Sequence, residues 1–125
     1  HLAEGAPMTN LLLEIGKANP NIPNIDGICA LHLAVQRMDA GSVRTLLKHN
    51  AKVDIADNTR WFTPLHLATF PGIDDHPANA RGRTIIVDLL CGGDQLDLNE
   101  KDREGNTPLH YAVQIETADA GDVVN

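Results

Sequence analysis

Apolar residues fall in pairs of short clusters along the chain, each with the spacing of one helix face. The first cluster of each pair contains Leu-His-Leu-Ala or Leu-His-Tyr-Ala, at 31–34, 65–68 and 109–112. The second cluster is a run such as Ser-Val-Arg-Thr-Leu-Leu at 42–47. The pattern predicts helices at about 8–16, 30–36, 40–48, 64–70, 83–91 and 108–115, then a link at 116–120 and a helix starting near 121.

The paired clusters recur with a period of about 33 residues. Histidines mark it at 1, 32, 66 and 110, with spacings of 31, 34 and 44. The long third interval contains an insertion over 71–82, in which two prolines and two glycines disfavour a regular helix. We therefore expect residues 71–82 to form an exposed loop. One pair of short helices cannot bury its apolar face alone, so the units must stack.

The residues in front of the first helices predict how those helices begin. Thr63 and Thr107 can cap a helix N-terminus with their hydroxyls. Pro64 and Pro108 follow at the first helical position, where no backbone donor is needed. Cys29 stands at the cap position of the other unit, so we expect that helix to lack a side-chain cap, at a cost of about 1 kcal/mol.

This sequence resembles the ankyrin repeat family in its period and in the motif Thr-Pro-Leu-His, complete at 63–66 and 107–110. The resemblance covers essentially the whole chain. It implies an all-α repeat solenoid of stacked helix–turn–helix units joined by short β-hairpin turns. Gly27 and Gly105 can supply the positive φ of such turns, and the turn before Thr63 holds one extra residue. The expected units are 1–24, 25–57, 58–102 (with the insertion) and 103–125.

Composition narrows the classes of partner. The chain has 125 residues, 42% of them hydrophobic and only four aromatic, so its core must be built from Leu, Ile, Val and Ala. Its formal net charge is −7, and an acidic surface repels phosphate backbones and anionic lipid. No apolar run approaches the roughly 20 residues that span a bilayer. We therefore expect neither nucleic acid nor membrane as a direct partner.

The two cysteines bear on the compartment. Cys29 and Cys91 both lie in apolar stretches. We interpret them as buried free thiols in preference to a disulfide. Reduced cysteines favour an intracellular location, in the cytoplasm, the nucleus or both.

The six histidines raise the question of catalysis or metal binding. The resemblance implies that His32, His66 and His110 are structural and tie adjacent turns together by hydrogen bonds. They lie about 10 Å apart, too far to share a metal through bonds of roughly 2 Å. His49 ends a helix, where imidazole suits the helix dipole. Asp74-Asp75-His76 could supply metal ligands, but a solvated loop is the preferred interpretation. We expect no catalytic residue, metal, cofactor or small-molecule substrate.

The resemblance places partner contacts on the hairpin tips and the first helices, along a concave face. Trp61 stands out in a chain with four aromatic residues, and a Trp beside Arg60 is typical of a binding hot spot. Phe62 is a second candidate, with inward packing as its alternative. The predicted contact residues are Asn24, Asp26, Gln36, Arg37, Met38, Arg60, Trp61, Phe62, Thr69, Phe70, Lys101, Arg103 and Gln114.

Two asparagines are candidate modification sites. Ankyrin domains offer an Asn in the extended segment after the second helix to asparaginyl hydroxylases. Asn21 and Asn99 match that position, while Asp54 replaces it in the middle unit. Asn21 also has Leu13 eight residues before it, as such substrates tend to have.

The leading hypothesis for function is a non-catalytic scaffold that binds another protein or peptide. The alternatives are a targeting or substrate-recruiting region of a larger enzyme or transcriptional regulator, and an autoinhibitory lid within the same protein. An enzyme within these residues is the weakest hypothesis. The chain begins abruptly at His1 and stops abruptly at Asn125, and we expect it to be part of a longer protein.

Overall fold

A computed structural model describes residues 8–71, 80–92 and 97–124. Over these ranges the chain is helical and contains no strand. The predicted all-α solenoid is confirmed, although the hairpin turns form without strands. The helices are α2 (Met8–Glu14), α3 (Ala30–Gln36), α4 (Ala40–Lys48), α5 (Pro64–Thr69), α6 (Ala80–Cys91) and α7 (Pro108–Val124).

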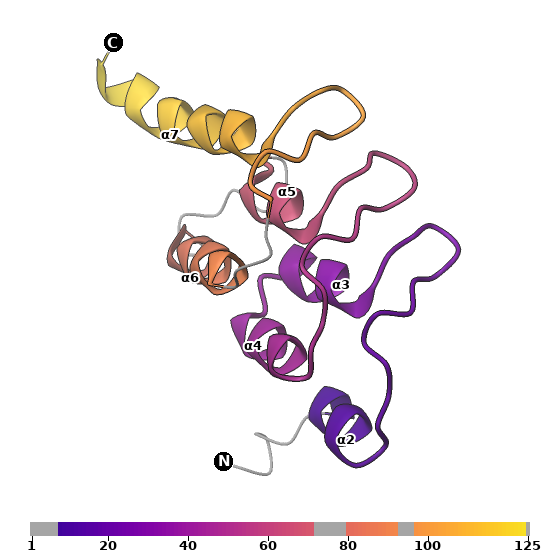
Figure 1. Ribbon diagram of the computed structural model, residues 1–125. Helices are drawn as coiled ribbons and strands as arrows, with labels where there is room; N and C mark the ends of the chain where they lie inside the picture. Colours follow the sequence, from indigo (N-terminus) through magenta and orange to yellow (C-terminus); the bar gives the residue numbers. More distant parts are fainter. Residues whose placement is uncertain (1–7, 72–79, 93–96, 125) are drawn as a thin grey trace.

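The helices stack in two rows (Figure 1). One row contains α3, α5 and α7, and the other contains α2, α4 and α6. Helix α3 packs on α4 and α5, and α5 also packs on α6 and α7. Long turns precede α3, α5 and α7 and project to the same side of the stack (Figure 1). Each turn therefore lies beside the turns of its neighbours.

The core lies between the two rows and is aliphatic, as the composition predicts. Leu31, Val35, Val43, Ile86 and Leu90 are all less than 2% exposed. Burying a side chain of this size stabilises the fold by about 1.5–3 kcal/mol. These residues come from two successive helix pairs, α3/α4 and α5/α6, and Leu13 of α2 belongs to the same cluster, so the core is continuous along the stack and no pair is an independent unit.

The helix starts follow their cap residues. The Thr63 hydroxyl accepts from the backbone N–H of His66, with Pro64 at the first helical position. Cys29 makes no side-chain cap hydrogen bond, as predicted. At the other end of α5, the Arg83 side chain donates to the carbonyls of Ala68 (2.8 Å) and Phe70 (3.1 Å). A basic side chain therefore satisfies acceptors that the helix end leaves open.

Two predicted boundaries are wrong. Helix α7 runs unbroken to Val124, where the sequence analysis expected a link at 116–120. That segment contains neither proline nor glycine, so each residue can extend the helix by one hydrogen bond. Helix α6 begins at Ala80, so the last three residues of the predicted 71–82 loop are helical despite Gly82. The rest of that loop, apart from Pro71, lies outside the described residues, and so does Asp74–His76.

The cysteines differ in their surroundings. Both are free thiols, as predicted. Cys29 is buried, and burial raises the pKa of its thiol. Cys91, the last residue of α6, is exposed, contrary to the prediction. No helix in the described part of the chain has the length and apolar character needed to cross a membrane.

Candidate functional site

The three projecting turns are closed by the same backbone hydrogen bond. We call residues 24–28 the first turn, 57–62 the second turn and 102–106 the third turn. In each, the N–H of the first residue donates to the carbonyl of the last, at 2.9 Å, 2.9 Å and 2.8 Å. The second turn closes over one additional residue, which is the extra residue seen in the sequence.

The first side chain of each turn holds the loop. Asn24 Oδ1 accepts from the N–H groups of Asp26 (2.8 Å) and Ile28 (3.0 Å). The Oδ1 of Asp57 accepts from three backbone N–H groups of its turn, and that of Asp102 accepts from two. Asn24 therefore has a structural role that sequence reasoning missed. The signal was a recurring Asn or Asp five or six residues before the cap position.

Adjacent turns are bonded to one another. Asn58 N–H donates to the carbonyl of Asp26 at 2.9 Å, which joins the second turn to the first. Arg103 joins the third turn to the second, since its N–H donates to Arg60 O (2.8 Å) and its Nη2 to Asn58 O (3.2 Å). The turns therefore form one bonded ridge along the stack.

The motif histidines reinforce this ridge. His32 Nε2 lies 3.0 Å from the carbonyl oxygen of Phe62, and His66 Nε2 lies 3.0 Å from that of Asn106. Each ring also accepts at Nδ1 from the backbone N–H of its helix cap residue. Burial outweighs these backbone bonds at His32 and lowers the pKa of its imidazole below the usual value. These rings are buried structural groups.

Trp61 occupies a position that glycine fills in the neighbouring turns. Gly27 and Gly105, each just before the last residue of its turn, have φ values of 78° and 84°. Trp61 stands at the matching place with φ 62°. A left-handed backbone costs a residue with a Cβ about 1 kcal/mol or more. The Trp61 side chain is 49% exposed, and the Arg103 guanidinium lies 4.8 Å from its ring centre.

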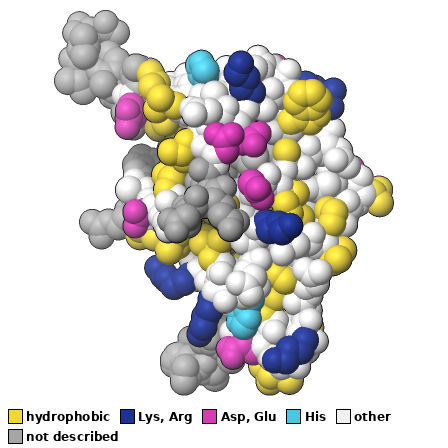
Figure 2. Space-filling model, in the orientation of Figure 1, with side chains coloured by type: hydrophobic (Ala, Val, Ile, Leu, Met, Phe, Trp, Pro, Cys, Tyr) yellow, Lys and Arg dark blue, Asp and Glu magenta, His cyan; other side chains and the backbone are white. Residues whose placement is uncertain are grey.

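Arg60 lies beside an aromatic cluster. Its guanidinium is 5.3 Å from the ring centre of Phe62 and 5.2 Å from that of Phe70. A cleft of about 170 Å³ opens here, and Arg103 and Tyr111 help to line it. On the side where the turns project, hydrophobic side chains lie next to Lys and Arg side chains (Figure 2). The ridge therefore presents an aromatic surface bordered by guanidinium groups.

Comparison with known proteins agrees with this geometry. A family model described as ankyrin repeats (three copies) matches residues 2–77. The chain belongs to the ankyrin repeat family. The bonded turns and the buried histidines are therefore features of an ankyrin stack.

Several curated proteins contain a similar stretch. Alpha-latrotoxin-Lg1a of Latrodectus geometricus is 32% identical over 94 residues, which is 75% of this ankyrin chain and 6% of the toxin. Protein PhlB of Serratia liquefaciens is 32% identical over 114 residues, covering 91% of this chain and 45% of PhlB. Rabankyrin-5 of Homo sapiens is 29% identical over 143 aligned positions, covering 87% of this chain and 12% of that protein. The chain thus spans less than half of each relative.

Two residues expected on the binding surface of the ankyrin stack are buried. Phe62 is 3% exposed, and its ring stacks on His66 and packs against Phe70 and Tyr111. Thr69 is 7% exposed, and its hydroxyl donates to the carbonyl of Leu65 at 2.9 Å. Both side chains pack within the stack, so the expectation that they stand exposed on its outer surface is corrected. Phe62 faces inward because the rings of His66, Phe70 and Tyr111 surround it.

The other predicted contact residues of the ankyrin chain lie at the surface. Met38 and Phe70 are half-buried. The exposed residues are Asn24, Asp26, Gln36, Arg37, Arg60, Trp61, Lys101, Arg103 and Gln114. The second and third turns bring Arg60, Trp61 and Arg103 together, whereas Gln36, Arg37 and Gln114 lie at the helices.

Tyr111 and Asp102 form a buried pair that the sequence analysis did not single out. The Tyr111 hydroxyl donates to Asp102 Oδ2, and Asn106 Nδ2 donates to that hydroxyl at 3.2 Å. Burial raises the pKa of Asp102, but the hydrogen bonds from the Tyr111 hydroxyl and from the turn backbone outweigh it, so the pKa lies below its usual value. Burial also raises the pKa of Tyr111. The pair fastens the first turn of α7 to the third turn.

The two candidate hydroxylation sites differ. The Asn21 side chain accepts from Lys52 N–H (2.7 Å) and donates to Asn50 O (3.1 Å), so it joins its segment to the next unit. Asn99 is exposed. Hydroxylation of either residue stays a prediction. Among the described residues, no group of three or more His, Cys, Asp or Glu side chains could hold a metal ion.

Proposed function

We propose that this ankyrin chain is a non-catalytic interaction module that binds a protein or peptide on its projecting turns and the adjoining first helices. Ankyrin repeats are generally protein–protein interaction modules and are typically non-catalytic. The binding residues would centre on Trp61, Arg60 and Arg103, with the exposed residues of α3 and α7 as flanking contacts.

The conformation of Trp61 carries this proposal. A large aromatic side chain stands where glycine would meet the backbone requirement without strain. It adds little to the core, because it is 49% exposed. Strained residues gather at functional sites, and Trp is the residue type most enriched in binding hot spots. A partner that covers the indole would account for its presence in a left-handed turn.

A second candidate concerns the protein that contains this chain. The chain spans between 6% and 45% of the three relatives described above. That share favours the alternative that it is a recruiting or autoinhibitory region of a larger enzyme or transcriptional regulator. Assaying any activity of the full protein with wild-type Trp61 and with Trp61→Gly would separate autoinhibition from recruitment. Activity that rises in the variant supports autoinhibition, and unchanged activity supports simple recruitment.

The binding surface itself is tested by titration of a partner recovered with the wild-type chain. Trp61→Gly removes the indole and keeps the turn conformation that Gly27 and Gly105 adopt. It should weaken binding by about 2 kcal/mol or more. Leu12→Ala, which removes a 60% exposed side chain from α2, is the control and should bind as wild type. Equal affinities for wild type and a folded Trp61→Gly would place the surface elsewhere.

A further inference from the structure

We propose that the cleft between the second and third turns reads an acidic side chain of the partner, with the Arg60 guanidinium as the group that binds its carboxylate. This inference rests on the proposed function and names the chemistry of the partner. Its basis is the Arg60 side chain. Two aromatic rings hold the guanidinium in place, but no side chain of the described residues forms a hydrogen bond or ion pair with it.

The guanidinium of Arg60 lies over two aromatic rings. Phe62 and Phe70 lie at 5.3 Å and 5.2 Å, and their own rings pack edge to face at 5.3 Å. Arg83 in turn fixes the end of α5 by donating to the carbonyl of Phe70. The stack restricts the side chain before any ligand arrives, so less conformational entropy is lost on binding.

The donors of that guanidinium remain available. No residue in the described ranges forms a side-chain hydrogen bond or ion pair with it. The nearby acids are already engaged, since Asp57 accepts from three backbone N–H groups and Asp102 accepts from Tyr111 and the third turn. A planar guanidinium with open edges is suited to a bidentate bond with a carboxylate.

Basic side chains outnumber acids among the exposed charges of the two turns. Arg60 and Arg103 are exposed, whereas Asp57 and Asp102 are buried and Glu104 is the one exposed acid of the two turns. Glu104 and Asp102 also line the cleft, the latter with its carboxylate bonded to Tyr111 and to the third turn. The chain as a whole is acidic, so this patch departs from the average surface. An acidic peptide segment is therefore the partner chemistry that fits this part of the ridge.

The size of the cleft sets the kind of anion. About 170 Å³ admits a carboxylate with its adjoining methylenes, which is the side chain of Glu or Asp. Phe62, Phe70 and Tyr111 form the aromatic part of its lining, and a charge-assisted hydrogen bond is stronger beside such apolar groups than in bulk water. Trp61, held by Arg103 at 4.8 Å, stands at the edge of the same patch and offers an apolar surface to the neighbouring residue of the peptide.

The test begins with a random linear peptide display library selected on the wild-type chain. Peptides that bind should share an acidic residue. A selected peptide and its Glu→Gln or Asp→Gln counterpart are then titrated against wild type, Arg60→Gln and Arg60→Lys. Wild type should prefer the acidic peptide by about tenfold or more. Arg60→Gln should abolish that preference. Arg60→Lys should keep only part of it, because an ammonium group lacks the two parallel N–H donors with which a guanidinium binds a carboxylate.

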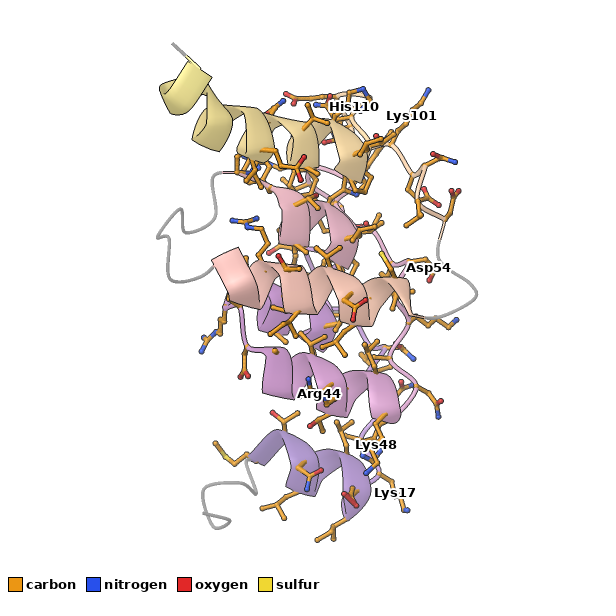
Figure 3. All side chains as sticks on the ribbon, turned by 90° about the vertical axis from the view of Figure 1, so that its left-hand side faces the viewer. Lys17, Arg44, Lys48, Asp54, Lys101 and His110 are labelled. Carbon is orange, nitrogen blue, oxygen red and sulfur yellow. The ribbon has the colours of Figure 1, made fainter. Side chains whose placement is uncertain are left out.

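Arg44→Gln is the matched control. Arg44 is exposed on α4, in the row of helices away from the turns (Figure 3), so the preference should be unchanged. Thermal unfolding of each variant verifies the fold. Equal losses for the acidic and neutral peptides on Arg60→Gln would overturn the carboxylate assignment. Peptides that need Trp61 but no acid would overturn it and leave the proposed function standing. Peptides insensitive to both Trp61→Gly and Arg60→Gln, or no selected peptide, would overturn both.

Discussion

The second and third turns solve the same backbone problem with different residues. Each is closed by an Asp N–H, and each has a left-handed residue before its last position. That residue is Trp61 in one turn and Gly105 in the other. A Cβ added at Gly105 would meet no atom within 4 Å, whereas one at Gly27 of the first turn would lie 2.8 Å from Asn58 Oδ1.

The difference separates two reasons for glycine in a turn. The first turn needs glycine because both the side chain and the backbone of Asn58 occupy the space. The third turn needs it only because of φ, and that cost is small enough for other interactions to outweigh. The second turn carries a Trp at the same place, so its backbone tolerates the strain. The predictions below test which side chains around Trp61 stabilise the conformation of this turn.

The largest effect should come from the last residue of the second turn. Phe62→Ala removes the ring that packs against His66, Phe70 and Tyr111. We expect a loss of about 3–5 kcal/mol in the free energy of unfolding, measured by urea titration. Asn106→Ala, at the matching place in the third turn, should cost far less. Equal losses would mean that the aromatic cluster does not distinguish the two turns.

The next effect concerns the anchor of the third turn. Tyr111→Phe removes the hydroxyl that donates to Asp102 and should cost about 1–3 kcal/mol. Because the pKa of Asp102 is lowered by folding, its stabilisation is present above the unfolded value and is lost as pH falls through the folded value. Urea titrations between neutral and strongly acidic pH should therefore show a shallower acid loss in Tyr111→Phe. Parallel curves would contradict the role of this hydroxyl.

Exchanging the left-handed residues gives a smaller effect. Gly105→Ala should cost about 1 kcal/mol, entirely through φ, since no atom crowds the new Cβ. Trp61→Gly relieves strain but loses the contact with Arg103, so the net change should stay within about 1 kcal/mol. Thermal unfolding of both variants measures this. A much larger loss in Trp61→Gly would make the indole a structural anchor in place of a binding group.

The smallest effect extends the comparison to the helix after the first turn. Cys29→Thr restores the cap hydroxyl that Thr63 supplies to α5. It should raise the free energy of unfolding by about 0.5–1 kcal/mol. Cys29→Ser, with a smaller side chain and the same hydroxyl, serves as the control. Destabilisation by both would show that the bond from Cys29 Sγ to Asn21 O outweighs the missing cap.

The sequence predicted the parts of the fold that depend on local pattern. Helices α3 and α4 have the predicted bounds, because α3 contains the Leu-His-Leu-Ala motif and Asp39 caps α4 from the position just before it. The inward position of Phe62 could not be predicted, because it depends on Tyr111 from a distant part of the chain. The unbroken α7 was missed because the link at 116–120 was inferred from the repeat period of the other units. The helical propensity of those residues themselves was given less weight. The pairing of Arg103 with Trp61 likewise required the stack.

The histidine bonds join residues 30 apart in one unit and 40 apart in the next, yet both measure 3.0 Å. The contact between successive turns is thus the same whether a unit contains more or fewer residues. Lengthening a connection between two anchored helices costs little, since closure entropy grows only with the logarithm of loop length. The connection between α5 and α6, whose sequence at 70–79 contains extra residues, is therefore a natural place for insertions. Foreign epitopes, tags or sensor peptides could be grafted there. The spacing of the turns, and with it the alignment of a bound partner, would be preserved.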